Sequence, residues 1–290
     1  MRSALIKLHI AVFFWGFTGV LGRLITLNAP LLVWYRLIIT IITLFILLFA
    51  TGKIEKLSVK KIVQLFSVGA IVALHWVCFY GSIKYANVSI ALVCLSSAGL
   101  FTAVIEPIFT SKKFNSKEFL LGFIGIAGIY LIFHFDPHYK TGIIIGLLAT
   151  IFSVVFSILN KKVVASIAPK TMMLYELSGG LIAVTILLPF YLKAFPTNQL
   201  IPSLSDWFWL VLMSWFCTVL AMDLSLQALK KVSAFTQNLT LNLEPVYGII
   251  LAFAVYHENK ELGIGFYFGF GLIILSVALQ MLRIVKYKNV

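Results

Sequence analysis

The strongest constraint on the fold is a series of ten apolar runs, each 18–24 residues long, separated by short polar segments. A helix needs about 20 apolar residues to cross the hydrocarbon core of a bilayer, whereas a barrel strand needs only about ten. We therefore predict an all-α membrane protein with ten transmembrane helices, over residues 5–26, 30–50, 62–84, 87–109, 118–135, 141–160, 171–191, 206–229, 233–256 and 262–284.

The composition agrees with a chain that lies almost entirely within a membrane. Hydrophobic residues make up 61% of the sequence and charged residues 11%, whereas a soluble domain has about 25% charged residues. These values exclude a soluble globular enzyme, a disordered protein and a nucleic-acid-binding module. The three cysteines lie inside apolar runs and form no CxxC pair, so we expect no metal site and no cofactor.

The basic residues predict how the chain is oriented in the membrane. With a cytoplasmic N-terminus, 17 of the 23 Lys and Arg residues fall on the inner side and 4 on the outer side. Such an excess over short loops marks the cytoplasmic face, and it places the net charge of +13 beside anionic lipid. We therefore expect a multi-pass protein of the inner (plasma) membrane with both termini cytoplasmic and the lipid bilayer as a partner.

The second half of the chain repeats features of the first half at offsets of 139–144 residues. The matching pairs are Ala29-Pro30 with Ala168-Pro169, Tyr35-Arg36 with Tyr175-Glu176, Val88-Ser89 with Val232-Ser233, and Gly122-Phe123 with Gly265-Phe266. Because five is odd, two five-helix repeats (residues 1–136 and 137–290) must enter the membrane in opposite directions. Inverted repeats of this kind favour alternating access around a site between the halves.

Two motifs near the end of the chain carry a family resemblance: Leu243-Glu244-Pro245 and His257-Glu258-Asn259-Lys260. With them, the ten-span chain resembles the EamA-like branch of the drug/metabolite transporter superfamily, which are bacterial inner-membrane carriers. The resemblance implies export or exchange of a small polar metabolite such as an amino acid. The first repeat departs from the family pattern, because Ala98-Gly99 and Lys112-Lys113 stand where Glu-Pro and an acidic residue are expected.

Ionisable side chains inside the spans are costly and are therefore candidate functional groups: Arg23, Arg36, Glu106, Glu176, Asp223 and Glu244. Glu244 lies near the midplane, where it is either a proton-coupling carboxyl or a carboxyl bonded to a neighbouring helix. Asp223, near Lys230, and Glu176, in the first turn of its span, are further candidates for coupling or gating. We expect Arg23 to extend its charge outward to the outer surface.

A second group of residues is expected to bind the substrate. Arg36 either binds a carboxylate or extends toward the outer surface. Asn238, Asn242 and Gln237 form a polar stripe on the span that carries Tyr247, and amides also serve as contacts between helices. Trp15, His75, Trp76 and Tyr80 either line a cavity or pack against neighbouring helices.

No motif of a hydrolase, metalloprotease or ATPase is present, since the chain has no HExxH, GxSxG or Walker lysine loop. We therefore predict a secondary transporter and not an enzyme, with a small-molecule substrate and with protons as a candidate coupling ion. Two alternatives stay open at this point. One is an intramembrane enzyme that uses His75 with Glu244 or Asp223 on a lipid-linked substrate, and the other is a passive channel.

Overall fold

The computed structural model describes residues 2–110, 116–135, 137–232, 237, 240–241 and 243–288, and all regular secondary structure in them is helical. The first half contains α1 (Arg2–Leu24), α2 (Ala29–Ala50), α3 (Val59–Tyr85), α4 (Val88–Leu95), α5 (Ala98–Phe109) and α6 (Ser116–Phe135). The second half contains η1 (Pro137–Tyr139), α7 (Lys140–Val163), η2 (Val164–Ser166), α8 (Pro169–Ala194), α9 (Leu204–Leu212), η3 (Met213–Leu220), α10 (Ala221–Leu229), α12 (Leu243–Tyr256), η4 (Glu258–Lys260) and α13 (Ile264–Lys288).

Seven of the described helical segments are long and apolar enough to cross a membrane, and three shorter apolar helices accompany them, over 123–132, 243–256 and 264–276. The predicted all-α membrane class is therefore confirmed. Two predicted spans are less regular than expected. The span 87–109 is interrupted where Ser96 and Ser97 turn their hydroxyls back onto the carbonyls of Leu92 and Cys94.

The second irregular span, 206–229, contains the π-helical segment η3 between α9 and α10. Within it, the Thr218 hydroxyl donates to the carbonyl of Met213, five residues earlier, at 3.3 Å. A π-helical turn changes the direction in which the following side chains point, and such turns occur often at functional sites. Thr218 itself lies at the cavity described below.

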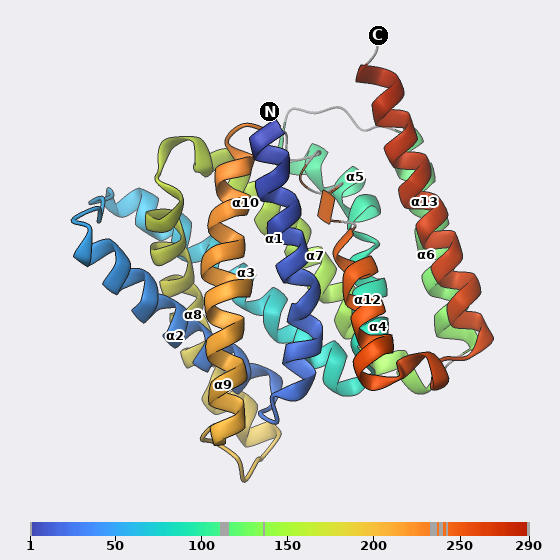
Figure 1. Cartoon of the computed structure of the whole chain (residues 1–290), viewed down its shortest axis with the longest axis horizontal. Coiled ribbons are helices and arrows are strands. Elements are labelled where there is room, and N and C mark those ends of the chain that lie inside the picture. Colours follow the sequence, from blue (N-terminus) through green and yellow to red (C-terminus); the bar gives the residue numbers. More distant parts are fainter. Residues whose placement is uncertain are drawn as a thin grey trace.

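Contacts between the two halves of the chain follow a two-fold pattern. The contact of α3 with α7 has its counterpart, with the two halves exchanged, in the contact of α10 with α1. In the same way, the contact of α4 with α7 corresponds to that of α12 with α1. α3 also packs on α8 as α2 packs on α9 and η3, while α6 packs on α13 at one edge of the bundle (Figure 1). Each contact thus recurs with the roles of the halves exchanged, which is the arrangement that two related repeats produce.

Glycines allow two of these helix pairs to approach closely. A Cβ atom on Gly69 of α3 would lie 1.6 Å from the carbonyl oxygen of Glu176 in α8. A Cβ atom on Gly128 of α6 would lie 2.4 Å from the carbonyl oxygen of Gly269 in α13. Both helix pairs therefore depend on small residues where their backbones meet, as is usual for helices packed within a bilayer.

Asp206 fixes the start of α9 against the connection between α1 and α2. Its buried carboxylate accepts hydrogen bonds from the backbone and hydroxyl of Thr26, at 2.7 and 2.8 Å. It also accepts bonds from the Gln199 amide and from the backbone and hydroxyl of Ser203, whose side chain caps α9 in return. One carboxylate thus joins a helix N-terminus to a segment about 180 residues away.

We expect Asp206→Asn to lower the free energy of unfolding by about 1–3 kcal/mol, because the amide loses the charge and turns one acceptor oxygen into a donor. The midpoint of thermal unfolding of the purified protein measures the effect. Ser205→Ala, at the exposed neighbouring position, is the matched control and is expected to leave the midpoint unchanged. Equal midpoints for the Asp206 variant and the control would contradict this role.

Candidate functional site: a central cavity lined by both halves

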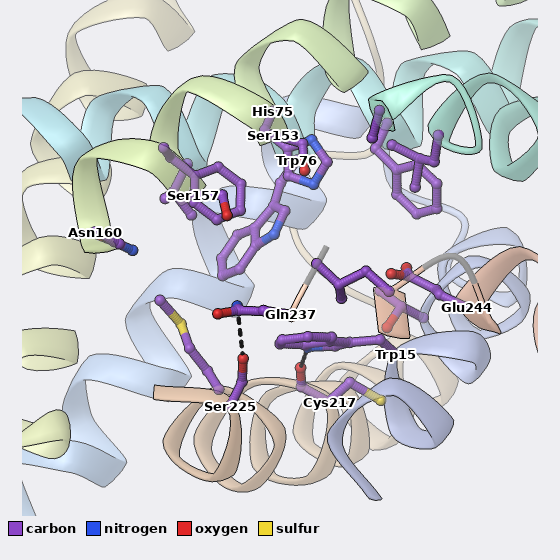
Figure 2. Close-up of a pocket in the computed structure, with 18 of the residues that line it drawn as sticks. Trp15, His75, Trp76, Ser153, Ser157, Asn160, Cys217, Ser225, Gln237 and Glu244 are labelled. Carbon is purple, nitrogen blue, oxygen red and sulfur yellow. Dashed lines mark hydrogen bonds between the residues drawn. The ribbon is translucent and has the colours of Figure 1, made fainter. Parts of the chain in front are cut away.

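A cavity of about 120 Å³ lies between the two halves of the chain (Figure 2). The first half lines it from α1 to α5, and the second half lines it from α7, η3, α10 and α12. A buried water needs roughly 10–15 Å³ by the same kind of measure, so the cavity has room for several waters or a small molecule. The cavity thus lies where helices of both halves meet.

Arg36 supplies the positive charge of the cavity. Its side chain is only 1% exposed, and its Nε donates to the Thr218 hydroxyl at 2.9 Å. Nη1 donates to the hydroxyl of Tyr80, and the guanidinium carbon lies 3.9 Å from the centre of the Trp76 ring. The interpretation that Arg36 extends toward the outer surface is therefore wrong, since three side chains from α3 and η3 hold the guanidinium inside the protein.

Glu244 supplies the negative charge. It lies in the first turn of α12 and lines the same cavity as Arg36, together with Pro245. In the described part of the chain, no hydrogen bond or ion pair joins its carboxyl to another side chain, and Figure 2 shows it pointing toward the cavity. A carboxyl with this environment is available to a proton or to a cationic group of a ligand.

Aromatic and amide side chains complete the walls. The indole of Trp15 donates to the carbonyl of Cys217 at 3.0 Å, which holds its ring at the cavity (Figure 2). Nδ1 of His75 donates to the carbonyl of Ala149 at 2.8 Å, so this ring nitrogen carries a proton. Gln237 donates to the Ser225 hydroxyl at 3.1 Å, while its own carbonyl oxygen is buried with no donor among the described residues.

The structure thus brings together five predicted site residues at the cavity: Trp15, Arg36, His75, Trp76 and Glu244. Tyr80 is fully buried behind Arg36 and does not line the cavity. Tyr247 also lies outside the lining, where its ring packs 5.8 Å from that of Phe13. The predicted residues Asn238 and Asn242 lie outside the described part of the chain.

Three other predicted placements are corrected. Asp223 pairs with Lys170 of α8 at 2.5 Å and not with Lys230, since seven residues along a helix separate two side chains by about 10 Å. The charge of Arg23 does not end in solvent alone, because the partly exposed guanidinium forms an ion pair with buried Glu258. α8 begins at Pro169, so Glu176 lies beyond its first turn, out of reach of the helix N-terminus.

A polar face on α7 was not predicted from the sequence. Ser153, Ser157 and Asn160 lie at intervals of four and three residues, so they share one side of the helix, and all three line the cavity (Figure 2). The signal was present in the sequence as three polar residues at helical spacing within an otherwise apolar run. Serine hydroxyls are easily overlooked because they also bond to their own helix backbone.

Together, the apolar helices, the repeated halves and the cavity with two opposite charges between them define a membrane transport protein. A family model described as the EamA-like transporter family matches residues 2–134 and again residues 140–282, and the chain belongs to this family. It is therefore a membrane transporter and not an enzyme, which excludes the alternative of an intramembrane enzyme. The family resemblance predicted from the sequence is confirmed.

Two individual proteins are similar to the chain over most of its length. An uncharacterized transporter of Bacillus subtilis (strain 168), YetK, is 22% identical over 271 residues, which cover 89% of this chain and 81% of the relative. A protein of known crystal structure superposes with a TM-score of 0.66 at 14% identity and covers 98% of both chains. The second likeness shows the fold alone.

Proposed function

We propose that the protein is a secondary transporter that exports a small polar metabolite, such as an amino acid, by alternating access around the central cavity. The observation that carries this proposal is the pair of opposite charges on one cavity, Arg36 and Glu244, between the aromatic walls of Trp15 and Trp76. A zwitterion of modest size satisfies both charges at once. Because the two charges come from different repeats, a relative movement of the repeats changes the distance between them.

The topology that fits this proposal has ten spans, two inverted repeats that meet near residue 136, and cytoplasmic termini in the inner membrane. Figure 1 shows the first turn of α1 and the last turn of α13 at the same end of the bundle, as an even number of spans requires. The excess of basic residues in the segments assigned to that side supports a cytoplasmic location for it.

Two ion pairs join helices of the bundle, and one of them is a candidate gate. Asp223 of α10 binds Lys170 of α8, and Arg23 of α1 binds Glu258, which follows α12. The first pair joins two elements of the second half, whereas the second pair joins the two halves. We propose that the second pair opens and closes with the transport cycle, and that the first holds α8 and α10 together during it.

We expect Glu244→Gln to abolish coupling to a proton gradient or to weaken substrate binding, because the amide has neither a titratable proton nor a negative charge. Uptake and counterflow of a panel of radiolabelled amino acids into proteoliposomes, with and without a pH gradient, measure both effects. Exposed Glu55→Gln is the matched control and is expected to behave as the wild type.

Wild-type counterflow supports a carrier, whereas flux without counterflow would favour the passive channel. A Glu244 variant with unchanged transport and unchanged pH dependence would contradict the assigned role of this carboxyl.

A further inference from the structure

Glu176 and Asn160 form an isolated polar contact deep in the protein. Glu176 is 0% exposed and Asn160 is 3% exposed. The Asn160 amide nitrogen donates to Oε1 of Glu176 at 3.0 Å, which joins α7 to α8. The remaining two oxygens, Oε2 of Glu176 and Oδ1 of Asn160, are both buried and have no hydrogen-bond partner among the described residues.

An ionised carboxylate does not fit this arrangement. A carboxylate and an amide carbonyl oxygen are both acceptors, so neither can satisfy the other, and each would stay buried without a donor. A proton on Oε2 turns that atom into a donor, and the amide that already bonds the other carboxyl oxygen carries an unpartnered acceptor, Oδ1 of Asn160. A hydrogen bond from a protonated Oε2 to Oδ1 would close a cyclic acid–amide pair and would satisfy both atoms.

The charged groups around Glu176 do not compensate an ionised carboxylate. Ionisable side chains occur on α8 and on the segments that contact it in this region: Arg36 of α2, Lys53, Glu55 and Lys56 of the connection between α2 and α3, Lys60, Lys61 and His75 of α3, Lys161 and Lys162 of α7, Lys170 and Tyr175 of α8, and Asp223 of α10. None of them forms an ion pair or hydrogen bond with the Glu176 carboxyl in the described part of the chain.

Several of these groups have other partners. Lys161 donates to the carbonyls of Leu229 and Val232, both at 2.9 Å, and Lys170 pairs with Asp223. The backbone of α3 at Gly69 lies against the backbone of α8 at Glu176, so there is no space for a further side chain from that direction.

We propose that Glu176 and Asn160 form a buried proton-binding site at the side of the cavity, and that this site couples transport to protons. Asn160 lines the cavity while Glu176 lies behind it, so a proton reaches Glu176 from cavity water past the amide. Figure 2 shows Asn160 at one side of the cavity and Glu244 at the other, with Trp76 and Gln237 between them. The proton site is therefore separate from the charge that faces the substrate.

The bound proton also determines how many hydrogen bonds link α7 to α8. When Glu176 is protonated, two hydrogen bonds link α7 and α8. When the proton moves to a water molecule, the remaining carboxylate needs hydration, and the closed site does not provide it. Deprotonation therefore favours a conformation in which this part of the cavity wall opens to water. This inference rests on the proposed function, because a coupling site has meaning only in a transporter.

The first test measures the proton itself, without transport. We expect the infrared spectrum of the wild type at neutral pH to contain a carboxylic-acid C=O band that disappears in Glu176→Gln and shifts in Asn160→Leu, where the amide partner is lost. Glu55→Gln, at an exposed position, is expected to leave the band unchanged. The glutamine at 176 reproduces both hydrogen bonds of the protonated pair, so this variant is expected to fold. The absence of any difference between Glu176→Gln and the wild type overturns the proposal.

The second test uses the same proteoliposomes as the transport assay. Glu176→Gln is expected to retain counterflow of substrate but to lose the stimulation by a pH gradient. If the wild type shows no counterflow, the proposed function fails. If the wild type transports and Glu176→Gln keeps its pH-gradient stimulation, only the proton site fails. Stimulation by a sodium gradient that depends on Glu176 also overturns the proposal, because the two oxygens would then hold a metal cation.

Discussion

Replacing Arg36 by Gln is expected to weaken substrate binding by about 30-fold or more, since loss of one partner of a buried, hydrogen-bonded charge pair costs about 2 kcal/mol or more. Arg36 is the charged group held most rigidly at the cavity, by Thr218, by Tyr80 and by the face of Trp76. A preorganised guanidinium binds a carboxylate with little further loss of side-chain freedom. Binding of the best substrate from the transport panel, measured by isothermal titration calorimetry, gives the ratio directly.

The conservative variant Arg36→Lys distinguishes the contribution of the positive charge to substrate binding from that of the planar guanidinium. It retains one positive charge but lacks the planar fork that bonds Thr218 and Tyr80 and stacks on Trp76, so we expect affinity between those of the wild type and Arg36→Gln. The exposed Lys53→Gln variant, which also removes a positive charge, is the matched control. Wild-type affinity in Arg36→Gln, with an unchanged unfolding midpoint, would place the substrate carboxylate elsewhere.

The helical class was predictable because the length of an apolar run is set by the thickness of the bilayer, whatever the tertiary contacts are. The interruptions within two spans were not predictable in the same way. The break at Ser96 and Ser97 depends on which carbonyl each hydroxyl reaches, and the π-helical turn ending near Thr218 depends on its packing against α2. Such local choices are decided by neighbours that are distant in the sequence.

For the candidate site, the sequence predicted which residues are functional candidates but not which residues they contact. Arg36, His75 and Glu244 could be selected because polar groups inside apolar runs are rare. Their partners could not be deduced, since the Arg36 contacts Tyr80 and Thr218 lie 44 and 182 residues away. Arg23 was assigned to the surface for this reason, because its partner Glu258 lies 235 residues away in a different repeat.

Glu258, the acidic residue of the family motif that follows the fourth helix of a repeat, has a structural role in this protein. Its carboxylate accepts hydrogen bonds from the backbone of Val88 and Ser89, at 3.0 and 2.8 Å, and from the Ser89 hydroxyl. It therefore caps the N-terminus of α4 in the opposite repeat, where the helix dipole favours a negative charge. The first repeat has Lys112-Lys113 where this acid is expected, and these two residues lie outside the described part of the chain.

We expect Glu258→Gln to lower the free energy of unfolding by about 3 kcal/mol, because the buried carboxylate accepts three hydrogen bonds besides the ion pair, and a hydrogen bond to a charged group contributes about 1.5–3 kcal/mol. The carboxylate is 0% exposed, and the substitution leaves the Arg23 guanidinium without its partner and weakens the cap of α4. The tie between the two halves at this end of the bundle is lost at the same time. A large fall in the midpoint of thermal unfolding of the purified protein is the expected observation.

Two further variants decide whether the cost comes from the pair or from the charge alone. Glu261→Gln removes an exposed carboxylate three residues away and is expected to leave the midpoint unchanged. Arg23→Gln is expected to cost about 1 kcal/mol, since its side chain is 32% exposed and water screens much of the interaction. The double variant should be less unstable than the sum of the single variants, because Arg23 and Glu258 act on each other. Full additivity would mean that Glu258 acts through the cap of α4 alone, and that the ion pair contributes nothing to holding the halves together.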